Sequence, residues 1–199
     1  MRVLVGCEFS GIVRDCFLAE GHDAISLDIL PTESPGPHII DDLINHLNDD
    51  YDLLIAHPPC TYLSSSGLHW NKRDPTRAEK TNAALEFITA IWNSPIPRIC
   101  IENPVGCINT RLPFMPKPQY IQPYQFGEDA SKKTGLWLKN LPPLVPTEYV
   151  EPRLVDGKPR WSNQSDAGQS RLGGGSGKER SVTYFGIAYA MATQWLKEE

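Results

Sequence analysis

The chain has 199 residues, which is enough for one domain with a buried core. Its composition, 40% hydrophobic and 22% charged, is that of a soluble globular protein, and no apolar run reaches the roughly 20 residues that a membrane-spanning helix needs. The net charge of −5 argues against a broadly basic nucleic-acid-binding protein, and no membrane partner is expected.

The first residues and the cysteines favour a cytoplasmic location. The opening segment MRVLVGCEFSG has a short apolar part and an early acidic residue, so it is interpreted as a strand rather than a signal peptide. The five cysteines are irregularly spaced, which predicts reduced thiols in a reducing cytosol rather than a disulfide framework. The sequence contains no Cys-x-x-Cys or His-x-x-x-His pair, so no metal site is expected.

Short β-branched runs alternate with helical patterns over the first half of the chain. Strands are expected over residues 2–6, 23–30, 38–40, 51–57 and 97–103, and helices over 12–21 and 74–94. This alternation predicts an α/β fold with a single doubly wound, mostly parallel sheet that has helices on both faces.

The longer helix and the second half of the chain give more local predictions. Thr76 and Glu79 fit a capping box for the helix over 74–94. One face of that helix is expected to carry Ala84, Phe87, Ile88 and Ile91. Further on, the patterns predict strands within 120–127 and 134–140, a proline-rich excursion at 141–152, a mobile loop at 163–181 and a helix within 183–199 with Ile187, Ala190 and Met191 on one side.

Polar features follow several predicted strands. In parallel sheets, ligands bind at the carboxyl ends of the strands. The loop after the first strand, Asp28, the HPPC segment at 57–60 and Glu102 all fall at such ends. We therefore expect these four features to meet at one edge of the sheet.

Charge is unevenly spread along the chain. Residues 1–130 contain 9 Lys and Arg against 17 Asp and Glu, whereas residues 131–180 contain 9 against 5. The basic part is interpreted either as a phosphate-facing side or as solvated loop charge.

Cys60 follows two prolines and precedes the hydroxyl-rich segment TYLSSSG. A thiol is only a few per cent ionised near pH 7, and a rigid Pro-Pro lead-in would hold it with little ordering cost. Taken alone, the residue is either a packing thiol or a nucleophile. Cys7, Cys16, Cys100 and Cys107 are interpreted as small packing residues.

The string PPCTYLSSSG resembles the nucleophile loop of the DNA cytosine-5 methyltransferases. Other segments are similar to that family in the same order: FSG at 9–11, Asp28, the pair Asp42 and Leu43, IENPVG at 101–106, and FGIAYAM near the C-terminus. The resemblance implies a Rossmann-like, S-adenosylmethionine-dependent methyltransferase fold over 1–199. It also implies DNA as the substrate, with residues 145–182 as a reduced, loop-rich substitute for the family's target-recognition insert.

The resemblance also implies roles for individual residues. The implied catalytic residues are Cys60, Glu102 and Asn103. The implied cofactor-binding residues are Phe9, Ser10, Gly11, Asp28, Ile29, Asp42, Pro58 and Gly186. The expected substrate-binding residues are Pro59, Ser64, Lys132, Lys133, Arg171 and Arg180, with Lys178 as a further phosphate contact.

In the implied mechanism the Cys60 thiolate adds to cytosine carbon-6, while Glu102 bonds ring N3 and the exocyclic amine. Carbon-5 becomes enamine-like and takes the methyl group, and loss of its proton with expulsion of Cys60 restores the ring. A duplex substrate would need its cytosine flipped out of the stack.

The sequence departs from the family pattern at several positions. Val13 replaces the second glycine of the first turn, Pro104 replaces a valine, and Ile187 replaces the asparagine of the last element. The Gln-x-Arg-x-Arg element has no copy, and Lys132 and Lys133 supply charge in its place.

Alternative interpretations remain open for single residues and for the function. Asp28 caps a turn or binds ribose hydroxyls, and Gly11 serves only a turn or also the cofactor. His57 is either a hydrogen-bonded wall or a catalytic group and stays outside the predicted catalytic set. Trp70 is a loop anchor or a base-stacking residue. Three alternative functions are also open. The chain could carry out the same chemistry on a free deoxycytidine nucleotide or on RNA, it could be a non-catalytic binding protein, or it could need a partner subunit for target recognition.

Overall fold

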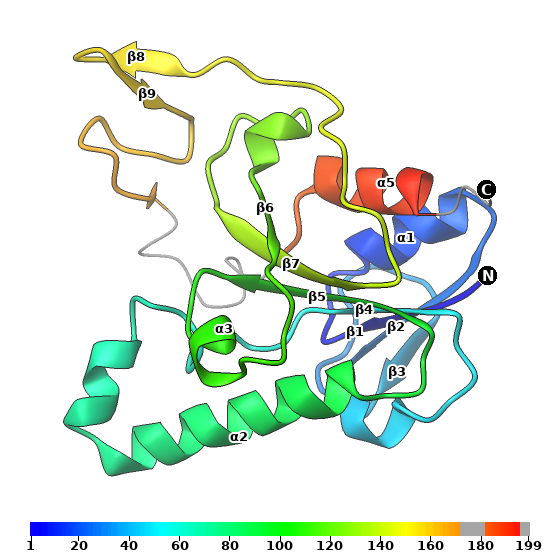
Figure 1. The fold of residues 1–199 in the computed structure, drawn as a ribbon. Coiled ribbons are helices and arrows are strands. Elements are labelled where there is room, and N and C mark those ends of the chain that lie inside the picture. Colours follow the sequence, from blue (N-terminus) through cyan, green and yellow to red (C-terminus); the bar gives the residue numbers. More distant parts are fainter. Residues whose placement is uncertain (172–181, 196–199) are drawn as a thin grey trace.

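The computed structural model describes residues 1–171 and 182–195. At its centre is a seven-stranded sheet of order β3-β2-β1-β4-β5-β7-β6 (Figure 1). The strands are β1 (Arg2–Gly6), β2 (Asp23–Asp28), β3 (His38–Ile40), β4 (Leu53–Ala56), β5 (Arg98–Pro104), β6 (Gln119–Ile121) and β7 (Thr134–Lys139). The strands β1 to β5 pair in parallel, and β7 runs antiparallel to both of its neighbours. The expected doubly wound, mostly parallel α/β fold is confirmed.

Helices cover both faces of this sheet. The helices α1 (Ile12–Ala19) and α5 (Phe185–Gln194) lie on one face, and α2 (Pro75–Trp92) and α3 (Ile108–Arg111) lie on the other (Figure 1). Successive strand residues point to opposite faces, so Val3 and Val5 pack in the cluster with α1 and α5, whereas Leu4 packs in the cluster with α2. The buried strands explain the nearly continuous apolar runs of the sequence.

The turn from β1 into α1 is built around a buried carboxylate. Glu8 accepts hydrogen bonds from the backbone N–H of Val13 at 2.7 Å and of Arg14 at 3.3 Å, which are donors that a helix start leaves unpaired. Gly11 takes a φ of 77°, which favours glycine. The Arg14 side chain is fully buried and donates to the carbonyl oxygens of Ser34 and Pro35, so it fixes the loop after β2.

The start of α2 differs from the sequence-based expectation. Its N-cap is Asp74, whose side chain accepts from the N–H of Arg77 at 3.3 Å, so the predicted Thr76–Glu79 capping box is wrong. The reason is Pro75, which occupies the first helical turn, where proline is favoured. The buried residues of this helix are Thr81, Leu85, Ile88 and Ile91, with Ala84 and Phe87 half-buried beside them.

The second half of the chain is only partly as expected. β6 is followed by a 3-10 turn at Pro123–Gln125, so the predicted strand at 120–127 is too long. A hairpin of β8 (Arg153–Val155) and β9 (Lys158–Arg160) was not expected. The helix α5 buries Ile187, Ala190 and Met191 as predicted. Within 1–171 and 182–195, no helix is long and apolar enough to cross a membrane.

Candidate active site

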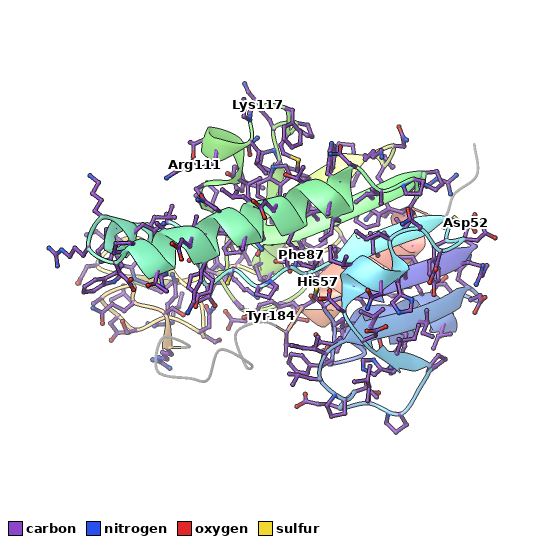
Figure 2. All side chains as sticks on the ribbon, turned by 90° about the horizontal axis from the view of Figure 1, so that it is seen from below. Asp52, His57, Phe87, Arg111, Lys117 and Tyr184 are labelled. Atoms are coloured by element: carbon purple, nitrogen blue, oxygen red, sulfur yellow. The ribbon has the colours of Figure 1, made fainter. Side chains whose placement is uncertain are left out.

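A pocket of about 450 Å³ lies where the strand order reverses between β1 and β4. Ligands of doubly wound sheets bind at this switch point, outside the carboxyl ends of the strands. Asp52 and His57 mark the two ends of β4, and the pocket is at the His57 end (Figure 2). Residues of its lining that matter below are Cys7, Phe9, Asp28, Asp42, His57 and Cys60.

Two of the three aspartates that line the pocket, Asp28 and Asp42, also cap turns. One oxygen of Asp28 accepts from the N–H of Leu30 at 2.9 Å. One oxygen of Asp42 accepts from the N–H of Ile44 at 3.0 Å and so caps the 3-10 helix η1 (Leu43–His46). Each aspartate therefore serves a turn and also lines the pocket, so the two interpretations of Asp28 are compatible.

The loop that carries Cys60 is bonded to the end of β5. Asn103 is 1% exposed and donates through Nδ2 to the carbonyl oxygen of Pro58 at 2.7 Å. Beyond it, the N–H of Cys107 donates to the carbonyl of Leu63 at 2.9 Å. A Cβ at Gly106 would overlap that same carbonyl oxygen, so this close approach requires glycine. The Pro-Pro-Cys loop and the Glu-Asn segment thus form one hydrogen-bonded unit.

Cys60 differs from the other four cysteines in its environment. It is exposed and lines the pocket. Burial, together with the charges of Asp28 and Asp42, raises the pKa of the Cys7 thiol to about 12. Burial likewise raises the pKa of Cys16 to about 11 and that of Cys100 well above its ordinary value. Thiols with such raised pKa values are poor nucleophiles, in line with their interpretation as packing residues.

Glu102 is paired with His57. The Glu102 Oε2 lies 2.8 Å from the His57 Nδ1, and the two side chains are only 11% and 6% exposed. Burial by itself raises the pKa of the Glu102 carboxyl, but the hydrogen bond and charge of His57 and the charge of Lys132 outweigh it, so the pKa is lowered. Glu102 is therefore held as a carboxylate. Among the described residues that line the pocket, His57 is present and Glu102 is not.

The implied cofactor-binding residues fall into two groups. Phe9, Asp28, Ile29 and Asp42 line the pocket, and Pro58 lines an adjoining one of about 390 Å³. The other three, Ser10, Gly11 and Gly186, lie outside the lining that the described residues form. Ser10 donates to Glu8. A Cβ at Gly11 would overlap the Arg14 guanidinium, and a Cβ at Gly186 would overlap the Phe126 carbonyl oxygen.

The expected substrate-binding residues do not form one surface. Pro59 lines both pockets, and Ser64 bonds to Ser66 beside them. The charge of Lys132 acts on Glu102, whereas Lys133 lies 4.4 Å over the Tyr120 ring. Arg171 is exposed at the end of the first described range, and Lys178 and Arg180 lie outside the described residues.

Trp70, which the sequence marks as a loop anchor or a base-stacking residue, lies in a group of cations and aromatic rings on the segment after Cys60, and its other four members are not among the predicted site residues. Arg77 and Lys80 lie 5.0 and 5.6 Å from the centre of the Tyr62 ring, which faces the adjoining pocket. Arg73 lies 5.5 Å from the exposed Trp70 ring. We name Tyr62, Trp70, Arg73, Arg77 and Lys80 the cation–aromatic group. Its signal in the sequence was the interleaving of basic and aromatic residues over 62–80.

The sequence matches no protein-family model and no curated protein. Among solved structures, a DNA modification methyltransferase encoded within an E. coli prophage aligns with a TM-score of 0.48 and 13% identity, over 78% of this chain and 53% of its own. The S. pombe Dnmt2 methyltransferase aligns with a TM-score of 0.40 and 18% identity, over 72% of this chain and 50% of its own. The chain spans about half the length of these two structures.

Proposed function

We propose that the protein is an S-adenosylmethionine-dependent cytosine carbon-5 methyltransferase that acts on DNA, with Cys60 as the nucleophile. The observation that carries the proposal is the hydrogen bond between Asn103 and the Pro58 carbonyl. It joins the two segments that most resemble the cytosine-5 methyltransferases, Pro-Pro-Cys and Glu-Asn, beside the switch-point pocket.

The pocket suits the proposed cofactor. Its volume is within the range of about 300–1,000 Å³ that is usual for small-molecule sites. Asp28 and Asp42 offer carboxylates to ribose hydroxyls and to a cationic ligand, and Phe9, Leu43 and Phe87 offer apolar walls to adenine. When bound, S-adenosylmethionine supplies an electrophilic methyl group.

The residues of the chain would do the rest of the chemistry. Cytosine carbon-5 is a poor nucleophile in the intact ring, and addition of the Cys60 thiolate to carbon-6 makes it enamine-like. Glu102, held as a carboxylate by His57, would accept a hydrogen bond from the exocyclic amine and so orient the base. Loss of the carbon-5 proton and expulsion of Cys60 would restore the ring.

The surroundings of Cys60 favour a nucleic-acid substrate. The cation–aromatic group provides both phosphate contacts and stacking faces close to the nucleophile. Lys132, Lys133, Arg171 and Arg180 are proposed as further phosphate contacts. The target cytosine would be flipped out of a duplex or taken from a single strand.

Methyl transfer from labelled S-adenosylmethionine tests the proposal directly. Duplex DNA, single-stranded DNA, RNA and dCMP are compared side by side, with Cys60→Ser as the inactive control. Carbon-5 labelling of cytosine in DNA is expected. Labelling of dCMP or RNA alone would show that the substrate is that molecule and not DNA. Activity only with a host extract would indicate a partner subunit. Cofactor binding without labelling of any of the four would contradict the proposed activity.

A further inference from the structure

His57 is a buried imidazole that the mechanism above uses only through Glu102. Its backbone N–H donates to the Gly6 carbonyl at 2.9 Å, which fixes the residue to β1. Its Nδ1 contacts Glu102 at 2.8 Å and the Thr183 hydroxyl at 3.4 Å. The other nitrogen, Nε2, is buried and has no hydrogen-bond partner in the described parts of the chain, although His57 lines the pocket together with Cys60.

A carboxylate on one imidazole nitrogen determines what the other nitrogen can do. The Glu102 carboxylate accepts a hydrogen bond from the Nδ1–H of His57, so the neutral imidazole has its lone pair on Nε2. The carboxylate also stabilises the imidazolium that forms when Nε2 takes a proton. An unpartnered polar atom in a buried side chain is costly unless a ligand or a reacting group meets it.

We propose that His57, oriented by Glu102, is the acid–base residue that removes the thiol proton of Cys60. The proposal rests on the proposed function, because it assigns a proton acceptor to the same nucleophile. Glu102 is then a positioning residue for His57 as well as a contact for the cytosine ring. Cys60, His57 and Glu102 then follow the general arrangement of nucleophile, base and orienting carboxylate.

The protons and electrons of the addition of Cys60 to cytosine balance within the site. The S–H bond of Cys60 breaks and an N–H bond forms at His57 Nε2, which leaves a thiolate and an imidazolium. The thiolate then forms the S–C6 bond, the electrons of the C5=C6 bond shift toward ring N3, and the imidazolium returns its proton to N3. The adduct is neutral and His57 is again neutral, so no further acid is needed.

Charged groups face His57 from more than one element of the fold. Glu102 faces it from the end of β5, and Glu8 faces it from the turn into α1. Burial raises the pKa of Glu8, and the charge of His57 acts against that rise. The charge of Lys132 lowers the pKa of Glu102, as His57 does, and so favours the carboxylate as well. The remaining titratable groups of the pocket are Cys7, Asp28, Asp41, Asp42 and Cys60.

The test is the pH dependence of Cys60 alkylation by iodoacetamide, followed residue by residue with mass spectrometry. It needs neither cofactor nor nucleic acid, so its outcome is separate from that of the methyl-transfer assay. His57→Gln keeps a donor for Glu102 but cannot take a proton. Near pH 7 this variant should react at least about tenfold more slowly than the wild type, because a thiol with an ordinary pKa of about 8.5 is then only a few per cent ionised. Near pH 9.5 the two rates should converge.

Controls separate this role from a structural one. Glu102→Gln, which leaves the imidazole in place and removes its counter-charge, should give an intermediate loss near pH 7. His22→Gln, in the turn between α1 and β2, should match the wild type. Cys7 in the same pocket should stay slow in every variant, since burial raises its pKa to about 12. A His57→Gln profile that coincides with the wild type, or a rate reduced equally at all pH values, would overturn the proposal.

Discussion

The Asn103 Nδ2 lies 2.7 Å from the carbonyl oxygen of Pro58, so the end of β5 determines where the Cys60 loop sits. Asn103→Ala would leave this buried carbonyl without its donor. We expect the free energy of unfolding to fall by about 1–3 kcal/mol, measured by urea denaturation, together with a loss of methyl transfer.

Asn109→Ala is the matched control for Asn103. Its side chain also donates to a proline carbonyl, that of Pro116 at 2.8 Å, but beside α3 rather than in the Cys60 loop. This variant should lose stability and keep its activity per folded molecule. Equal activity losses in the two variants would mean that the Asn103 contact has no special role at the site.

Asp28 is expected to bind the cofactor. Asp28→Ala should weaken the binding of S-adenosylhomocysteine, measured by calorimetry, by about 1.5–3 kcal/mol, the usual range for charge-assisted hydrogen bonds. Asp28→Asn retains an acceptor for the Leu30 N–H and so tests the charge separately from the turn. Asp23→Ala, at the opposite end of β2, is the control and should bind normally. Unchanged affinity in both Asp28 variants would count against the assignment.

The cation–aromatic group is expected to contact nucleic acid. Trp70→Ala should weaken the binding free energy for single-stranded DNA by about 1–3 kcal/mol, the contribution of one stacked base. The affinity of the wild type should fall steeply as the salt concentration is raised. Phe114→Ala is a suitable control, because Phe114 is 52% exposed and Trp70 is 49% exposed. Titrations of labelled single-stranded DNA at several salt concentrations would measure both effects. A flat salt response would favour a free nucleotide as the substrate instead.

The Glu102 pair predicts a pH dependence of stability. The folded-state pKa of Glu102 is lowered from the ordinary value of 4.5, so its stabilisation is present above the unfolded-state pKa and is lost as the pH falls through the folded-state pKa. The stability advantage of the wild type over Glu102→Gln should therefore shrink below about pH 4.5. Urea denaturation at several pH values checks this, with Glu79→Gln on α2 as the control. An advantage that grows toward acid pH would show that the sign is wrong.

The sequence was sufficient to predict the strands β1 to β5 of the sheet and the edge at which the pocket lies. Each strand from β1 to β5 is formed by an apolar run of the sequence. Parallel pairing places the carboxyl ends of these strands at the same edge of the sheet. Asp28 and the HPPC segment could therefore be assigned to one pocket edge before any distance was known. The hairpin of β8 and β9 has a signal in the sequence, since Asp156 and Gly157 are a dipeptide typical of hairpin turns.

The contacts between side chains could not be predicted in the same way. His57 and Glu102 are 45 positions apart, and their separation depends on the register of β4 against β5. A histidine before two prolines looks the same in the sequence whether it meets a carboxylate or solvent. Similarly, Glu8 precedes the turn glycine in the sequence, but only the course of the turn brings its carboxylate to the start of α1.

Covalent trapping on 5-fluorocytosine tests the central claim most directly. Fluorine at carbon-5 cannot leave as a proton does, so the enzyme should remain bound to the base when DNA carrying 5-fluorocytosine is incubated with protein and S-adenosylmethionine. Cys7→Ser is the control thiol variant from the same pocket and should still form the adduct. We predict that mass spectrometry will locate the adduct on Cys60 and that Cys60→Ser will form none while retaining cofactor affinity. An adduct on any other residue, or full methyl transfer by Cys60→Ser, would contradict the account.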